Sequence, residues 1–502
     1  MSITGPGSIT AMNVAAINSM NDQLNKLTTE LSTNQAAQTY SDLGSQAGIV
    51  LSLNSQLAAI NGYSNTATTV GTTLSVAQST LQQLDGVRTS VEQAINGQGT
   101  FALNNSGQTT IQSSSVTQLD NIFSLLNTQV GSNYIFSGSD QTQPSVASTN
   151  AILYGNGAQA GLTQVTANRL QADEGSNGLG RLVIPAASGS TVSISEDSSS
   201  PFGFKLGSIG SSLTGATVTG PSGSPPSASV DLTSNPNAGD SIQFALTLPD
   251  GSSQNVTLTA TTASPPGANQ FTIGATPSDT ATNLQTALSS AVGGLTKTAL
   301  PAASAIAASN NFFTSDPPQI VNGPPYATAT SLVNGTTANT VFWYTGDDSS
   351  TPARQTATAQ VGPTTSISYG MRANEPAIAS LVANVAALAV ASYSPSDPNA
   401  QASYQALSQK VTSNIDDPAG TQTISSIEAD LANAQTTVSN AGKLNTQTQT
   451  TLQNMLQNID GVNQTNIGEQ LMTLQNSMSA TLSVTARMAD LSLVNFLAPS
   501  AG

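Results

Sequence analysis

Residues 63–95 read YSNTATTVGTTLSVAQSTLQQLDGVRTSVEQAI, and this stretch decides the class of fold. Steps of four and three residues alternate through it without a break. The positions on this seam are Tyr63, Ala67, Val70, Leu74, Ala77, Leu81, Leu84, Arg88, Val91 and Ile95. The alternation is the a/d pattern of a heptad repeat, which predicts a helix that packs lengthwise on another helix. A helix over about residues 45–96 would be about 75–80 Å long at about 1.5 Å per residue.

Both ends of the chain carry further seams of this kind. At the N-terminal end they comprise Ile17, Met20, Leu24, Leu27 and Leu31, and then Val116, Leu119, Phe123, Leu126 and Val130. A C-terminal seam runs from Ile424 through polar Asn445 and Thr448 to Val462. The last one comprises Ile467, Leu471, Leu474, Met478 and Leu482, and it continues to the apolar LSLVNFL at residues 491–497. A shorter helix is predicted over residues 377–391, opened by Pro376.

The pattern changes between residues 141 and 370, where short alternating runs are separated by Gly, Pro, Ser and Asp. Residues 242–248 and 256–259 flank Pro249-Asp250-Gly251, which predicts a β-hairpin. Phe271 and Ile273 indicate a third strand, residues 280–292 a covering helix, and residues 357–361 and 366–369 another strand pair. The aromatic triplet Phe342-Trp343-Tyr344 is expected to anchor the core of this region.

These patterns predict a chain that is mainly α-helical at both termini, with an inserted β-rich or α+β middle region. The expected domains are residues 1–140, 141–370 and 371–502, with a small α+β unit at about residues 230–295. A solitary helix with a long apolar stripe is unstable in water. The two helical ends are therefore expected to pair as a long antiparallel coiled-coil rod, with each other, with other subunits, or with both.

Composition excludes many functions. The 502 residues include neither Cys nor His, which removes imidazole bases, thiolate nucleophiles, Cys/His zinc sites and disulfides. The 11 basic against 27 acidic residues leave a net charge of −16, so binding to nucleic acid or to an anionic membrane is not expected. Only 8% of residues are charged. Such a polar but uncharged surface can pack against copies of itself, which favours protein partners.

Neither a cleaved secretory signal nor a membrane span is expected. The first seven residues, MSITGPG, contain no basic residue and are not followed by an apolar run of signal-peptide type. The most apolar window, residues 377–391, includes Ser380 and Asn384 and is shorter than the roughly 20 residues that a membrane-spanning helix needs.

Several local patterns have ordinary explanations that we prefer. Gly155, Gly157 and Gly161 imitate a dinucleotide-binding loop, but no convincing helix or βαβ unit follows, so a flexible loop is expected. The acidic pairs at residues 196–197, 347–348 and 416–417 lack the spacing of a calcium loop and are expected in solvated turns. We therefore expect no enzyme, metal or cofactor site. Arg88 either pairs with a carboxylate on another helix or extends along the surface to solvent.

Two terminal motifs resemble those of bacterial flagellin and its relative, the flagellar hook-filament junction (hook-associated) protein. VGSNYIFSG at residues 130–138 resembles the junction proteins' G-x-Y-x-F-[SG]-G, and LSLVNFL at residues 491–497 resembles their L-S-L-x-[ND]-[FY]-L. Residues 240–288, WYTG at 343–346 and SYGMRANE at 368–375 look like inserts of alphaproteobacterial flagellin-like proteins. The filament-flagellin turn S-x-G-x-[RK]-[IV] is here STNQAA, without the Gly and the basic residue, which favours a junction or divergent role over a standard major flagellin.

The resemblance implies a structural, non-enzymatic subunit of the extracellular flagellum that is exported by the type III apparatus without cleavage. Its partners would be other copies of itself, neighbouring hook or filament subunits and an export chaperone. Its termini would be mobile in the monomer. The assembly interface that the resemblance implies comprises Ile17, Met20, Leu24, Leu27, Leu31, Leu471, Leu474, Met478, Leu482, Leu491, Leu493, Phe496 and Leu497.

Three other functions remain open at this stage. A filament flagellin proper would polymerise alone into long filaments. A secreted adhesin would depend on residues 141–370, so deleting them would abolish its function. A glycan-cleaving enzyme with two carboxylates is the least favoured alternative, and loss of activity on single Asp or Glu substitution would revive it.

Overall fold

The structure is a computed structural model that describes residues 6–39, 41–97, 101–415 and 421–496, with side chains in the terminal helices from residue 11 to residue 488. The helices of the N-terminal part are α1 (Pro6–Thr33), α2 (Ala47–Asn96), α3 (Thr110–Leu126), α4 (Thr149–Tyr154) and α5 (Leu162–Glu174). Those that follow are α6 (Pro277–Leu295), α7 (Ala299–Phe313), α8 (Pro376–Val390), α9 (Ala400–Ile415), α10 (Ile424–Asp460) and α11 (Gln464–Phe496).

The strands are short and lie mostly in the middle of the chain. The first seven are β1 (Gln129–Val130), β2 (Asn133–Tyr134), β3 (Leu182–Val183), β4 (Thr191–Glu196), β5 (Lys205–Ser211), β6 (Ala216–Ser222) and β7 (Ser227–Leu232). The others are β8 (Ser241–Thr247), β9 (Ser253–Thr261), β10 (Gln270–Thr272), β11 (Gln319–Val321), β12 (Leu332–Asn334), β13 (Thr358–Gln360) and β14 (Ser366–Ser368). Helices at both ends with a β-containing middle are therefore confirmed.

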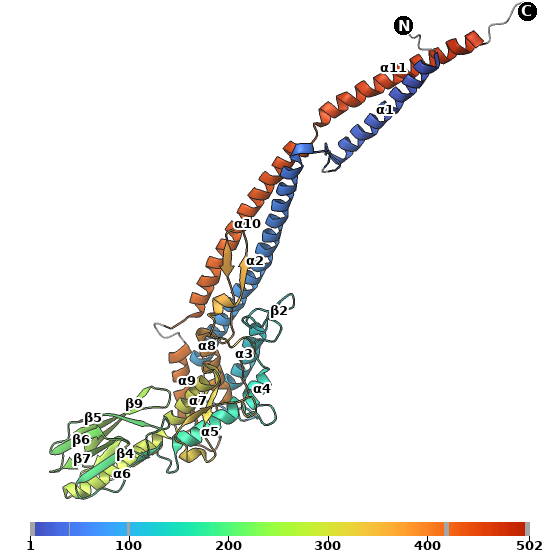
Figure 1. Cartoon of the computed structure of the whole chain (residues 1–502). Coiled ribbons are helices and arrows are strands. Elements are labelled where there is room, and N and C mark those ends of the chain that lie inside the picture. Colours follow the sequence, from blue (N-terminus) through green and yellow to red (C-terminus); the bar gives the residue numbers. More distant parts are fainter. Residues whose placement is uncertain (1–5, 40, 98–100, 416–420, 497–502) are drawn as a thin grey trace, which may run out of the picture. The chain divides into compact units, whose positions relative to one another are not determined.

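The chain divides into two compact units. The first comprises Met1–Val70, Ala359–Ile367 and Thr437–Gly502, and the second comprises Gly71–Thr358 and Ser368–Thr436. In the first unit, α1 packs against α11 and the two run antiparallel (Figure 1). Leu53 and Ile60 of α2 form an apolar cluster with Leu452 of α10. These contacts join helices that are hundreds of residues apart in the sequence.

The predicted long helix is present as α2, and its predicted seam is its buried face. Leu74, Ala77, Leu81 and Leu84 are fully buried, because steps of three and four keep them on one side of a helix with about 3.6 residues per turn. On α10 the seam is buried at Ile427, Leu431, Val438, Asn445 and Leu452. Met455 departs from the prediction, since it is exposed and the next residue, Leu456, packs into the apolar cluster instead.

The second unit contains two four-stranded sheets, with the orders β3-β4-β7-β6 and β10-β9-β8-β5. One apolar core joins both sheets to α6, which contacts strands of each. The predicted hairpin is confirmed as β8 and β9, and the predicted third strand is β10, which pairs with β9 in parallel. The strand pair β13-β14 is also confirmed.

Helices α7 and α8 form the centre of the helical part of the second unit. They pack on each other and on α9, while α5 packs on α7 and α3 on α8. Helix α8 confirms the prediction over residues 377–391. No pattern predicted α7, which is buried nearly all round and so lacks the polar face that would show a helical period.

Candidate assembly surface and motif junction

The first candidate site is the pair of terminal helices in the first unit. Apart from buried Ile467, its seam is only half-buried, whereas the α2 seam is fully buried from Leu74 to Leu84. The half-buried apolar residues are Ile17, Met20, Leu24 and Leu27 on α1 and Leu471, Leu474 and Met478 on α11. A groove of about 490 Å³ lies along the two helices, lined by Leu27 of α1 and Leu474 of α11 among polar neighbours. The pair therefore leaves apolar surface and space that a third element could fill.

Two residues of the predicted interface are exposed rather than half-buried. Leu31 is 39% exposed and Leu482 is 50% exposed. On α11 the seam continues through half-buried Thr481 and Thr485, because the alternation of four and three after Met478 leads to position 481 rather than 482. Met12, Val14, Met472 and Val484 are exposed as well.

Four further predicted interface residues cannot be assigned contacts. Leu491, Leu493 and Phe496 belong to α11, but their side chains lie outside the described residues. Leu497 lies outside the described residues altogether.

Two hydrogen bonds join the segment that follows α1 to the last residue of α10. The Ala36 amide donates to the Asp460 carbonyl oxygen at 2.6 Å, and the Ala37 amide donates to the Asp460 carboxylate at 3.0 Å. Gln35 and Gly461 form an isolated β-bridge beside them. Asp460 thereby holds the segment that follows α1 beside the turn between α10 and α11.

The second candidate site, in the second unit, is a junction between motifs that are far apart in the sequence. The Gly138 amide donates to the Met371 carbonyl at 2.9 Å, and the Ala373 amide donates to the Phe136 carbonyl at 2.8 Å. The Asp347 amide donates to the Ser137 carbonyl at 2.9 Å. Residues 136–138, 343–347 and 371–375 are thus hydrogen-bonded together, and we call this arrangement the motif junction.

An ion pair closes the motif junction. The Arg372 guanidinium lies 2.7 Å from the Asp347 carboxylate, and the two side chains are 11% and 10% exposed. Burial by itself raises the pKa of Asp347, but hydrogen bonds from Arg372 and from the Ser349 amide hold it well below its usual value. Arg372 also donates to the Ser349 carbonyl at 2.8 Å. Asp347 is therefore a charged structural group, unsuited to proton transfer near neutral pH.

Glu375, at the start of α8, carries a second cluster of polar contacts. Its carboxylate lies 2.6 Å from the Arg354 guanidinium and accepts from the Gln422 amide at 2.9 Å. The other carboxylate oxygen accepts from the Arg372 backbone amide at 3.2 Å. A buried carboxylate is costly unless it is paired, so these contacts explain how Glu375 can be buried. They also hold residues 372–375 in place immediately before α8 begins.

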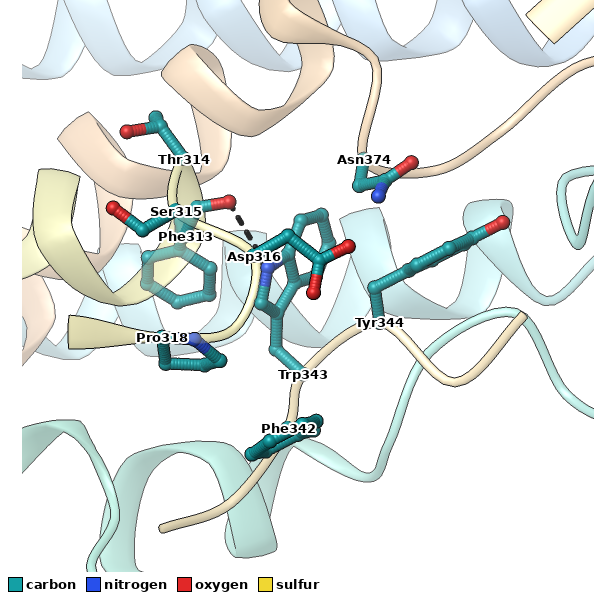
Figure 2. A pocket seen from close by; sticks show the side chains of 9 residues that line it. All are labelled: Phe313, Thr314, Ser315, Asp316, Pro318, Phe342, Trp343, Tyr344 and Asn374. Carbon is teal, nitrogen blue, oxygen red and sulfur yellow. Dashed lines mark hydrogen bonds between the residues drawn. The ribbon is translucent and has the colours of Figure 1, made fainter. Parts of the chain in front are cut away.

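The aromatic triplet lies beside the motif junction, and Figure 2 shows its side chains around a small cavity. Trp343 is buried, and its indole N–H donates to the Phe313 carbonyl at 3.0 Å. The cavity is about 40 Å³, far below the roughly 300 Å³ of a small-molecule site. Burial raises the pKa of Tyr344 and, together with the nearby charge of Asp348, that of Asp316. Trp343 thus has the core role that the sequence predicts.

The expectations about the acidic and glycine motifs are wrong in part. Glu196 lies in β4, not in a solvated turn, and its carboxylate pairs at 3.1 Å with Lys205, which begins β5 of the other sheet. Asp347 is likewise buried in the ion pair described above. Helix α5 does follow Gly161, although α4 rather than a strand precedes the loop, so no βαβ unit forms. Asp416 and Asp417 lie outside the described residues.

Other candidate groups are paired or structural. The Arg88 guanidinium lies 2.9 Å from the Asp85 carboxylate and 3.0 Å from that of Glu92, both on its own helix. In the described part of the chain, no group of three or more carboxylates could hold a metal ion. None of the helices described there is long and apolar enough to cross a membrane.

Comparisons with known proteins add no family to this description. No protein-family model matches the chain, and no curated protein matches it significantly.

Proposed function

We propose that this protein is a structural subunit of the bacterial flagellum, of the hook-filament junction type. It would assemble through its paired terminal helices with copies of itself and with neighbouring hook or filament subunits. In this proposal α1 and α11 form part of an antiparallel coiled-coil rod, and the β-rich middle faces the surroundings. The proposal includes export without a cleaved signal, aided by a chaperone.

The observation that supports assembly best is the incomplete burial of the α1–α11 pair. Met12, Leu31, Met472 and Leu482 are large apolar residues between 39% and 69% exposed. Fully burying such a side chain contributes about 1.5–3 kcal/mol, so a helix from another copy would gain roughly half of that at each position. Several such positions along two helices favour lengthwise packing with sibling molecules over an isolated monomer.

The flagellar part of the proposal is supported by the residues that carry the family resemblance. Residues 130–138 and 368–375 look unrelated in the sequence, yet they meet in the motif junction through the Gly138–Met371 and Ala373–Phe136 hydrogen bonds. We attribute the resemblance of both segments to flagellin-like proteins to this shared structural role. STNQAA at residues 32–37 supports the junction type over the filament type, as argued above.

Electron microscopy of a strain that lacks this protein tests the cellular role. Intact hooks without filaments, with filament subunits released into the medium, would support the junction role, and re-expression should restore the filaments. Shortened or altered filaments would instead favour a filament flagellin. Flagella that are unchanged in number, length and attachment would contradict both flagellar roles.

A further inference from the structure

A groove beside β10 has features that no part of the proposed function uses. It lies between the outer edge of β10 and one face of α6, and its volume is about 460 Å³, within the range of small-molecule sites. Its walls include Gln270 and Thr272 from β10 and Asn283, Thr286, Ala287 and Ser290 from α6. Small side chains on α6 leave the space open.

The backbone of β10 presents an unpaired donor and an unpaired acceptor on its outer edge. β10 is an edge strand, and it bonds to β9 through its odd-numbered residues, since the Thr259 amide donates to Asn269 and the Ile273 amide to Thr261. The even-numbered residues therefore face away from β9. Two of their groups are satisfied: the Gln270 amide donates to Gly267 at 3.2 Å, and Thr272 O accepts from Asn283 at 2.8 Å.

The Gln270 carbonyl and the Thr272 amide remain without a partner among the described residues. Together they form the donor–acceptor pair that a further strand would complete. The residues lining the groove, all of them described, include no charged side chain, and the polar ones are amides and hydroxyls. A charged ligand would lose its hydration there without gaining a counter-charge.

We propose that this groove binds an extended, uncharged peptide segment, which adds to the sheet as a strand beside β10. The peptide accepts a hydrogen bond from the Thr272 amide and donates one to the Gln270 carbonyl. Its side chains on that face lie toward Ala287 and Ser290 of α6. The occupant is a peptide rather than a sugar, because the one aromatic ring in the lining, Phe271, is buried and offers no stacking face.

The test uses the full-length protein labelled with ¹⁵N at threonine and the capped peptide acetyl-Thr-Ala-Thr-Ala-Thr-Ala-amide. Titration should shift the Thr272 amide resonance, which the variant T272V identifies. Both variants at position 272 lack this resonance, so their binding is followed by the amide of Thr286, which also lines the groove. T272P removes the N–H and should weaken binding about fivefold or more, as expected for one lost hydrogen bond. T272V keeps the N–H and should bind like the unmodified protein. An edge strand tolerates proline.

A second pair of variants keeps the proposal testable should T272P fold poorly. A287W fills the groove and should abolish the shift, whereas T282W, on an exposed position of the same helix, should leave it unchanged. The emission of Trp343 reports whether the second unit is folded in T272P and T272V. The proposal is overturned if the peptide causes no shift at millimolar concentration, if A287W binds as well as T282W, or if maltotriose shifts Thr272 and the peptide does not.

Discussion

The Asn445 side-chain amide donates to the Val361 backbone carbonyl at 2.8 Å, and this hydrogen bond joins α10 to the loop of the β13-β14 hairpin. Asn445 is 1% exposed and occupies a seam position of α10. A polar residue at such a position is costly unless its hydrogen bonds are made. The bond therefore places the hairpin at one position along the helix, much as a buried Asn sets register in coiled coils.

Replacing Asn445 by Ala should destabilise the first unit by about 1–3 kcal/mol, because the buried Val361 carbonyl loses its partner. Hydrogen exchange of residues 358–368 should accelerate, and mass spectrometry of the exchanged protein measures this. The control is Gln447→Ala, at an exposed position of the same helix. Equal exchange in the two variants would show that the bond does not position the hairpin.

Replacing Asp347 by Asn should destabilise the second unit by about 1.5–3 kcal/mol at neutral pH, as expected for hydrogen bonds to a charged group. The emission of Trp343, the single tryptophan in the chain, follows its unfolding in urea. Asp348→Asn, at the exposed neighbouring position, should have little effect.

The difference in unfolding free energy between the unmodified protein and the D347N variant should depend on pH. The pKa of Asp347 is lower in the folded protein than its usual value of 3.8, so the folded state favours the ionised form. Its contribution to stability is fully present above the unfolded pKa and is lost as the pH falls through the folded pKa. The difference in stability between the two proteins should therefore shrink progressively as the pH falls below about 4. A difference that stays constant from pH 7 to pH 3 would contradict the pairing with Arg372.

Two glycine substitutions should act in opposite directions. A Cβ at Gly346 would lie 2.7 Å from the Ser137 carbonyl oxygen and 2.8 Å from Ser137 Cα, so Gly346→Ala forces the motif junction apart. We expect a loss of about 1–3 kcal/mol, the usual cost of overpacking. At Gly442, inside α10, a Cβ meets nothing within 4 Å, so Gly442→Ala should stabilise by up to about 1 kcal/mol. Urea unfolding, followed by circular dichroism and Trp343 emission, measures both, and a tolerated Gly346→Ala would contradict the close approach.

Leu482→Asp should prevent self-association without unfolding the monomer, because this side chain is half exposed and lies off the α1–α11 seam. Sedimentation velocity measures association, and circular dichroism measures helix content. Ser483→Asp adds the same charge at the neighbouring exposed position and should associate normally. If both variants associate like the unmodified protein, exposed Leu482 has no part in assembly.

Local sequence patterns determined those elements whose burial repeats with a fixed period. The seam from Tyr63 to Ile95 predicted α2, and alternation around Pro249-Asp250-Gly251 predicted the β8-β9 hairpin, because one-sided burial imposes steps of three and four on helices and of two on strands. Helix α7 has no such period, since it is buried on nearly all sides. A four-residue step from Met478 puts Leu482 on the predicted seam, whereas the half-buried face of α11 follows the three-residue step to Thr481.

Only the tertiary structure decided which distant residues meet. Asn445 was visible as a polar interruption of a seam, but its partner Val361 lies 84 positions away. The same holds for Arg372 and Asp347, and for the unpaired edge of β10, which depends on the order of the strands. Hydrogen bonds and ion pairs require a particular distance and direction, and these follow from how the elements pack rather than from the spacing of residues along the chain.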